Sequence, residues 1–374
     1  MPRAWPALLV ALTACTAQQD DARAPANTGL RYLGGVADSG FERATQPREL
    51  RFPVDHGGHP TFQTEWWYLT RNLAGADGRH FGFELTFFRY AVAAATPTDE
   101  AASGWRADQI WMAHFAITDT KEQRFLTAER LSRQALGLAG VTTEPLRVWV
   151  EDWSLEGSDA AGRLTLRAEA HDEGIDLALE LAATQPPVAH GAAGLSRKGA
   201  TVGNASYYYS VPQLEAAGSV GVRGATFNVT GSAWLDREWS TSSLEAGIVG
   251  WDWFALHISD GASLMFYRLR TERGESSPYS GGSYVSPAGV RTELSAADVA
   301  LTPIDHWTSK TTGTRYPTAW RLLLASQGLD LEIRPYLQQQ EVDLSVRYWE
   351  GAVHADSRGE GRVTAQGYLE LAGY

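Results

Sequence analysis

The feature that most limits the fold of this chain is a repeated alternation of apolar and polar residues with a period of two. The stretch FGFELTF (residues 81–87) carries its apolar side chains on one face, and the same spacing recurs in residues 175–181, 320–324 and 329–333. Successive side chains of a β-strand point to opposite faces, so this spacing is typical of strands with one buried face. Asp-Gly dipeptides, which favour tight turns, separate several such stretches. The sequence therefore predicts an all-β protein.

The chain is long enough for two domains. It has 374 residues, and a segment rich in Pro, Gly and Ala at 185–200 divides the strand-like stretches into two halves. We therefore expect one β domain over residues 46–200 and a second over residues 201–374. Closed barrels or sandwiches are favoured for both, because closure removes exposed strand edges.

The N-terminal residues are typical of an exported lipoprotein. Residues 1–14 combine Arg3 with an apolar run, as in a short signal peptide. The stretch LTAC at residues 12–15 resembles the bacterial lipobox, and Cys15 is the only cysteine. We expect acylation of Cys15, a flexible polar tether over residues 15–45, and an anchor in the outer membrane facing the periplasm. No later apolar run reaches the ~20 residues that span a bilayer.

Charge and composition narrow the set of partners. The formal net charge of -12 would repel phosphate backbones, so nucleic acid is excluded as a partner. The 14 Trp, 14 Tyr and 12 Phe residues suit either a β core or a cavity for a hydrophobic small molecule. His56 and His59 of HGGH have a spacing that could bind metal, but a Gly-rich loop with two incidental histidines is the favoured interpretation. No metal or other cofactor is expected.

Candidate site residues fall in four aromatic clusters, at 63–68, 204–210, 234–239 and 250–254. Common catalytic signatures such as G-x-S-x-G are missing from the sequence. An aromatic core tied by one buried ion pair is an equally good interpretation of each cluster, whereas buried carboxyls beside aromatic walls favour function. The predicted ligand-binding residues are Glu65, Trp66, Trp67, Tyr68, Tyr207, Tyr209, Arg237, Trp239, Trp251 and Trp253, and the predicted acids are Asp236, Glu238 and Asp252.

Asp252 is the most constrained of these positions. Alternation places it on the same apolar face as Phe254, where an unpaired carboxylate would be costly. We therefore expect Asp252 to be buried and paired with Arg237, below an aromatic wall formed by Trp239 and Trp66.

Several motifs occur in the order found in a known family. TFQTEWWYLTRNL, FGFELTFFR, GNASYYYS, GSAWLDREWS, GWDWFALHISDG, YWEGAV and GYLELAGY together resemble the AttH/CrtC-like family. This is a lipocalin-related group of predicted secreted hydrolases that includes hydroxyneurosporene synthase (carotenoid 1,2-hydratase). The resemblance implies two lipocalin-like β-barrels, a hydrophobic ligand and, for AttH-type members, association with an ABC transporter permease.

The hydratase branch of the family is matched only in part. Its Asp-His-Asn-Trp-Gly pattern falls on residues 236–240, where Asp236 and Trp239 match but Arg237 replaces the His. Arginine cannot act as a general acid at neutral pH. We therefore expect a lipid-anchored envelope protein that binds or hands over a hydrophobic ligand beside an AttH-type ABC transport system. The alternatives are a hydratase, isomerase or hydrolase acting on a carotenoid- or isoprenoid-like substrate, and a purely structural envelope protein.

Overall fold

The computed structural model describes residues 40–94, 108–160, 163–172, 174–242, 244–358 and 363–374. The expected signal peptide, Cys15 and most of the expected tether lie outside this part of the chain. The helical elements within it are two short 3-10 turns, η1 (Val54–His56) and η2 (Ala325–Gln327). No helix among the described residues is long and apolar enough to cross a membrane. The remaining regular structure is β, which confirms the predicted fold class.

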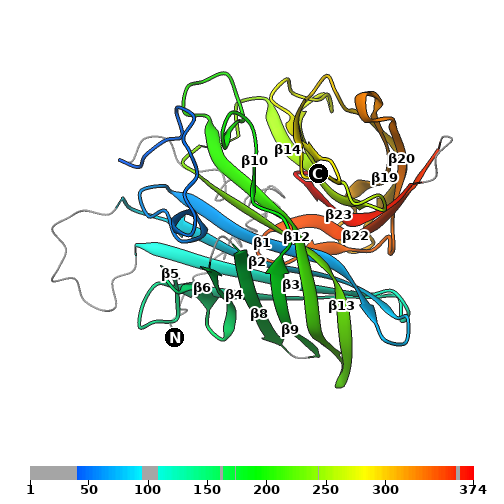
Figure 1. The fold of residues 1–374 in the computed structure, drawn as a ribbon, viewed down its shortest axis with the longest axis horizontal. Coiled ribbons are helices and arrows are strands. Elements are labelled where there is room, and N and C mark those ends of the chain that lie inside the picture. Colours follow the sequence, from blue (N-terminus) through cyan, green and yellow to red (C-terminus); the bar gives the residue numbers. More distant parts are fainter. Residues whose placement is uncertain (1–39, 95–107, 161–162, 173, 243, 359–362) are drawn as a thin grey trace, which may run out of the picture.

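The first sheet contains 13 strands. They are β1 (Thr64–Gly75), β2 (His80–Ala91), β3 (Gln109–Asp119), β4 (Arg124–Arg133), β5 (Ala139–Thr143), β6 (Leu146–Val150), β7 (Trp153–Ala160), β8 (Arg163–Asp172), β9 (Ile175–Ala183), β10 (Val188–Ala189), β11 (Leu195–Arg197), β12 (Ala205–Val222) and β13 (Ala225–Ser240). Their order is β4-β3-β2-β1-β13-β12-β9-β8-β7-β6-β5, with β10 and β11 also paired to β12. Because β6 approaches β3 and β4, the sheet nearly closes into a barrel (Figure 1).

The second sheet contains 10 strands and curls into a half-barrel. They are β14 (Ile248–Ile258), β15 (Ser263–Thr271), β16 (Gly281–Val285), β17 (Arg291–Ser295), β18 (Ala300–Thr308), β19 (Arg315–Leu324), β20 (Leu329–Pro335), β21 (Glu341–Asp343), β22 (Arg347–Ser357) and β23 (Thr364–Ala372). Their order is β17-β16-β15-β14-β23-β22-β20-β19-β18, with β21 paired to β22. Figure 1 shows this sheet, coloured yellow to red, above the first. The two sheets together form an arrangement of two lipocalin-like barrels.

The chain passes from one sheet to the other later than the sequence suggested. We expected the division at residue 200, yet β12 and β13 pair with β9 and β1 and so complete the first sheet. The change of sheet occurs between Ser240 and Ile248. The Pro- and Gly-rich segment at 185–200 supplies the short strands β10 and β11, which pair antiparallel to β12. A composition break therefore marked a connection within one sheet and not a boundary between two.

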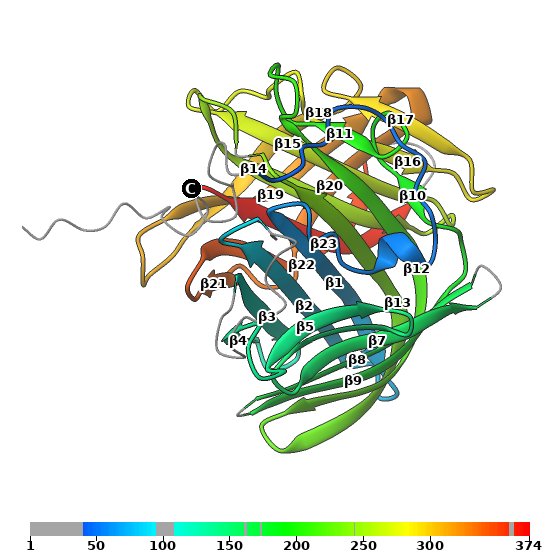
Figure 2. The same cartoon turned by 90° about the vertical axis from the view of Figure 1, so that its left-hand side faces the viewer.

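Each sheet buries its own apolar core on its inner face, and the two outer faces meet. One core contains Trp67 and Leu235 of the first sheet, and a second contains Phe254 and Leu331 of the second sheet. A third apolar cluster joins outer-face residues of both sheets, among them Tyr208. Strand β1 packs on β23 and β2 packs on β22, an arrangement visible in the perpendicular view (Figure 2). For the strands that meet between the sheets, the inner face thus belongs to one barrel and the outer face belongs to the contact between barrels.

Candidate functional site

A cavity of about 150 Å³ lies between the two sheets and is lined by their outer faces. A single buried water occupies roughly 10–15 Å³ on this scale, so the cavity has room for an organic molecule. Its aromatic lining consists of Trp66, Tyr68, Phe88, Tyr208, Trp251, Trp253, Tyr267 and Tyr348. Its charged or readily titratable lining consists of Asp236, Glu238, Glu350, Glu370, His114 and Lys198.

Strand alternation divides the predicted ligand-binding residues into two groups. On β1, Trp66 and Tyr68 line the cavity, whereas Glu65 and Trp67 turn into the first barrel. On β12, the cavity residues are Ser206 and Tyr208, and the predicted Tyr207 and Tyr209 belong to the first core. The cavity therefore borders one face of this motif, and the predicted Tyr207 and Tyr209 lie on the other.

The same division applies to the other two clusters. On β13, Asp236 and Glu238 line the cavity, and Arg237 and Trp239 are buried inside the barrel. On β14, Trp251 and Trp253 line the cavity, and Asp252 is not part of its lining. Two of the three predicted acids thus reach the cavity.

Asp236 is a buried carboxyl held by three donors. Tyr208 and Ser210, from the neighbouring strand β12, donate their hydroxyl protons to it, and Trp234 Nε1 donates at 2.6 Å. Trp253 Nε1 in turn donates to Tyr208 Oη at 3.0 Å, which ties Asp236 to the second sheet. Burial raises the pKa of Asp236 to about 7, against the opposing effect of these hydrogen bonds. A carboxyl with this pKa can both give and take a proton near neutrality.

A chain of hydrogen bonds fixes the orientation of Ser210. Its hydroxyl lies 2.6 Å from His190 Nε2, and His190 Nδ1 lies 3.0 Å from Ser283 Oγ. Burial, together with the nearby Arg291, holds the pKa of His190 well below its usual value, so the ring is neutral. Because Ser210 donates to Asp236, it accepts from the Nε2–H of His190, and Nδ1 then accepts from Ser283.

Glu238 lies beside the cation that lines the cavity. Lys198 Nζ is 3.3 Å from Glu238 Oε1 and 3.8 Å from the centre of the Tyr267 ring. Burial alone would lower the pKa of Lys198, but the attraction of Glu238 raises it. Lys198 is therefore an ammonium whose charge faces Glu238.

Glu350 and Glu370 are directly opposite each other on β22 and β23. Tyr68 donates its hydroxyl proton to Glu350 Oε1, and Trp251 Nε1 donates to Glu370 Oε1 at 3.0 Å. Burial and the nearby Glu84 raise the pKa of Glu350 well above its usual value, and burial raises that of Glu370 to about 8. These two carboxyls are therefore largely protonated at neutral pH.

Sequence reasoning missed five cavity residues that the geometry makes important: Lys198, Tyr208, Tyr267, Glu350 and Glu370. A signal was available for the last two. Each carboxyl stands beside residues that pack into the second core, Trp349 for Glu350, and Leu369 and Leu371 for Glu370. Strict alternation therefore puts both carboxyls on the opposite face. Lys198 follows the short strand β11 and had no comparable signal.

Asp252 is buried and paired, as expected, but its partners are not those expected. Arg268 Nε donates to Oδ2 at 2.6 Å, Arg270 Nη1 donates to Oδ1 at 3.1 Å, and Tyr374 Oη donates to Oδ1 at 2.5 Å. The predicted pairing with Arg237 is wrong, since Asp252 faces the interior of the second sheet and Arg237 that of the first. For the same reason Trp239 and Trp66 do not form the wall above it.

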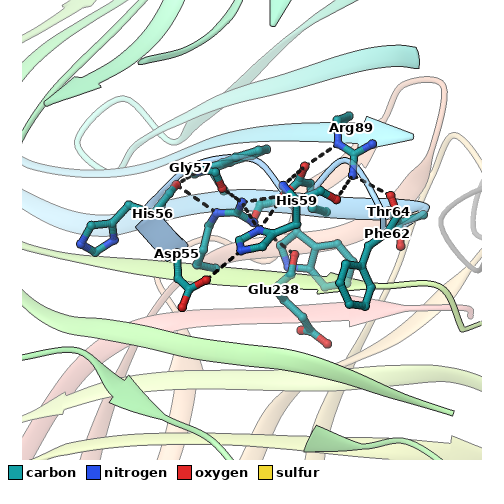
Figure 3. Close-up of polar contacts among 12 residues, drawn as sticks. Asp55, His56, Gly57, His59, Phe62, Thr64, Arg89 and Glu238 are labelled. Carbon is teal, nitrogen blue, oxygen red and sulfur yellow. Dashed lines mark hydrogen bonds and ion pairs between the residues drawn. The ribbon is translucent and has the colours of Figure 1, made fainter. Parts of the chain in front are cut away.

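Arg237 instead belongs to a buried ionic cluster in the first barrel. Figure 3 labels two other members of this cluster, His59 and Arg89. Its Nη2 is 2.6 Å from Glu65 Oε2, and Arg89 forms a second ion pair with Glu65 Oε1. Burial alone would raise the pKa of Glu65, but Arg89 and Arg237 hold it well below its usual value. The Arg237 guanidinium also stacks over Trp67, 3.6 Å from the ring centre. The residues of this cluster are not part of the cavity lining.

The two histidines of HGGH complete the same cluster. His59 stacks on Trp239 with ring centres 3.7 Å apart, and its Nε2 lies 3.0 Å from Asp55 Oδ1. His56 Nδ1 is 2.7 Å from Tyr209 Oη. No group of three or more His, Cys, Asp or Glu side chains suited to a metal ion occurs among the described residues. The loop holds the segment before β1 against the end of the first barrel.

Comparisons with known proteins agree with this architecture. The AttH-like family matches residues 43–374. The crystal structure of an AttH protein from Nitrosomonas europaea is 32% identical, covers 89% of this chain and 100% of its own, and superposes with a TM-score of 0.78. No curated protein sequence matches the chain.

Two further solved structures share the fold at lower identity. Kievitone hydratase from Nectria haematococca is 15% identical over 90% of this chain and 98% of its own, with a TM-score of 0.67. CghA is 13% identical over 91% of this chain and 97% of its own, with a TM-score of 0.52. At these identities the similarity concerns the fold alone.

Proposed function

The chain belongs to the AttH-like family, and from that premise we propose that it is a hydratase-like enzyme that protonates an unsaturated hydrophobic molecule held between its two sheets. The observation that carries the proposal is Asp236, a buried carboxyl with a pKa of about 7 on the wall of an aromatic cavity. A general acid works best when its pKa is close to the working pH. The fold shared with kievitone hydratase supports the same class of reaction.

The residues around Asp236 allow a balanced hydration. The Asp236 carboxyl gives its proton to one carbon of a C=C bond, whose π electrons form the new C–H bond. The faces of Tyr208 and Trp253 stabilise the positive charge left on the other carbon. Water adds to that carbon, and its surplus proton passes to the Glu238 carboxylate or back to Asp236. Lys198 Nζ, 3.3 Å from Glu238 Oε1, supplies the counter-charge beside this acceptor.

Hydration can be tested with a panel of alkenes in place of the natural substrate. The purified protein is incubated with lipophilic alkenes of isoprenoid and phenolic type in heavy-oxygen water, and products are analysed by mass spectrometry. We expect each product molecule to contain one labelled oxygen atom from water with the wild type. With Asp236→Asn we expect no labelled product. Asp298→Asn is the control, since this carboxyl is exposed and is not part of the cavity lining. Equal turnover by wild type and Asp236→Asn would rule out this role for Asp236.

Binding and delivery of a hydrophobic molecule is the second candidate function. The aromatic lining of the cavity supports it, because such walls suit a hydrophobic ligand. Mass spectrometry of compounds extracted from the purified protein would identify a retained ligand. Recovery of an unmodified lipophilic compound, with no labelled product in the hydration assay, would favour delivery over catalysis.

We also propose that Cys15 carries the lipid that holds the protein in the cell envelope. The proposal is supported by the LTAC stretch and by Cys15 being the only cysteine. Cys15→Ser should move the exported protein from the membrane fraction to the soluble fraction. Continued sedimentation of this variant with membranes would show that a protein partner, such as a transporter permease, holds it there.

A further inference from the structure

We propose that the ligand of the cavity between the sheets is a hydrophobic organic cation, an amine or quaternary ammonium on an apolar skeleton, whose charge lies beside Glu350 and Glu370. The inference rests on the proposed function, because it names the substrate class of the same cavity. It concerns the part of the cavity that the hydration step does not use.

Acidic side chains outnumber basic side chains around the cavity. Four carboxyls line it, and Lys198, the lysine of the lining, is already paired with Glu238 at 3.3 Å. His114, also in the lining, lies between Glu129 Oε1 at 3.0 Å and Tyr348 Oη at 2.6 Å. Among the described lining residues no basic side chain is therefore left for Glu350 and Glu370. A cationic ligand would favour the ionised form of one of these otherwise protonated carboxyls and form an ion pair with it.

Glu350 has the geometry of a binding group. It is 1% exposed, and its Oε2 has no hydrogen-bond partner among the described residues. Glu370 is its direct neighbour across β22 and β23, and like charges in that position repel. A buried acceptor without a partner is unfavourable unless a ligand or water satisfies it. Ser206 Oγ, also buried in the lining, lacks a partner in the same way.

Aromatic rings surround the two carboxyls. Tyr68 donates to Glu350, Trp251 donates to Glu370, and Tyr348 lines the cavity beside them. The faces of Trp and Tyr attract organic cations, and rings combined with carboxylates are the usual means of recognising alkylammonium groups. The apolar skeleton of the same ligand would pack on the remaining rings of the cavity.

This occupant is compatible with acid catalysis by Asp236. Tyr68 is the cross-strand partner of Asp236 and donates to Glu350, so its side chain lies between the two carboxyls. An ammonium bound to one ionised glutamate forms a neutral pair. The electrostatic environment of Asp236 then changes little, and its proton remains available.

The test compares three probes that share a phenylbutyl tail and carry heads of different charge. They are phenylbutyl-trimethylammonium, its uncharged isostere with a tert-butyl head, and phenylpentanoate. Binding is followed by quenching of intrinsic tryptophan fluorescence at about pH 9, above the pKa of about 8 of Glu370. We expect the cation to bind about tenfold more tightly than the isostere, and the anion to bind more weakly than either.

Isosteric variants identify the residues responsible. Glu350→Gln and Glu370→Gln should each remove most of the preference for the cation and leave the affinity of the uncharged isostere unchanged. Glu215→Gln, an exposed position on β12, should leave all three affinities unchanged. Circular dichroism shows whether each variant is folded. The comparison of the three probes on the wild-type protein does not depend on the variants.

The two proposals fail in different ways. Equal affinity for the cation and the isostere would overturn the cationic ligand and leave hydration in place. Turnover that does not depend on Asp236 would overturn hydration and leave the ligand class in place. Failure of all three probes to bind would also overturn the cationic ligand.

Discussion

At Asp236, burial and hydrogen bonding act on the same carboxyl in opposite directions. Burial disfavours the charged form, and the donors Tyr208, Ser210 and Trp234 favour it. The resulting pKa of about 7 therefore depends on keeping all three donors. Among these donors, Ser210 is the one whose hydroxyl is oriented by a residue outside the cavity lining. That residue is His190, whose Nε2 contacts Ser210 Oγ.

Removal of that donor should raise the pKa of Asp236 further. A hydrogen bond to a charged group contributes about 1.5–3 kcal/mol, and one pKa unit corresponds to about 1.4 kcal/mol. Ser210→Ala should therefore raise the pKa of Asp236 by about one unit or more, as measured by NMR of the labelled carboxyl carbon. Ser219→Ala, farther along β12 and outside the cavity lining, is the control. An unchanged pKa in Ser210→Ala would mean that this hydroxyl does not hold the carboxylate.

Asp236 should also make stability depend on pH. Its carboxyl binds a proton more tightly in the folded protein, with a pKa of about 7, than in the unfolded chain, with a pKa of 3.8. The contribution of Asp236 to stability is therefore fully present below about pH 4. As the pH rises from about 4 to about 7, this contribution is lost, and the free energy of unfolding falls by up to about 4 kcal/mol. Asp236→Asn cannot titrate.

The difference between variant and wild type isolates this contribution, because Glu65 and Glu370 titrate in both proteins. The free energy of unfolding of Asp236→Asn, measured by urea denaturation between pH 4.5 and 7.5, should fall less with rising pH than that of the wild type. Parallel curves for the two proteins would contradict the raised pKa of Asp236.

At the scale of single elements, Asp252 joins β14 and β15 to the end of the chain. Its partners Arg268 and Arg270 come from β15, and Arg270 Nη2 also donates to the carbonyl oxygens of Ala372 at 2.9 Å and Gly373 at 2.7 Å. The C-terminal Tyr374 donates to the same carboxylate. One buried charge therefore orders the last residues after β23.

Loss of this carboxylate should destabilise the protein without affecting the cavity. Asp252→Asn leaves two buried guanidinium groups without their counter-ion and should cost roughly 3–5 kcal/mol of the free energy of unfolding. Asp252→Asn combined with Arg268→Met should cost less than the sum of the two single changes, because the two groups interact directly. Chemical denaturation measures both effects. Additive losses would show that the pair is not coupled.

The sequence predicted where strands occur, but it did not predict which face of each strand borders the cavity. All four alternating stretches form strands, in β2, β9, β19 and β20. In clusters such as 63–68 both faces carry large apolar or aromatic side chains, so alternation identified which residues share a face but not which face borders the cavity. The mistaken pairing of Asp252 with Arg237 has a similar cause. Closeness in sequence does not reveal that the chain changes sheets between β13 and β14.

At the scale of the whole molecule, the barrel interiors and the cavity should respond separately to mutation. Leu235 on β13 is buried in the first core, and Leu269 on β15 is buried against the cavity. Leu235→Ala should cost about 2–5 kcal/mol of stability and leave probe affinity unchanged. Leu269→Ala should change probe affinity because it reshapes the cavity wall. Thermal melts and the fluorescence titration would test the pair, and a loss of affinity in Leu235→Ala alone would contradict this separation.

The cavity wall is contributed by two bodies whose interiors are already filled. A small rotation of one sheet over the other would alter the distance between Trp253 and Tyr68, now 5.1 Å between ring centres, without opening either core. The shape of the cavity can therefore drift during evolution at little cost to folding. Relatives with nearly the same barrels can accept ligands of quite different size, so overall similarity of fold is a weak guide to which molecule each one takes.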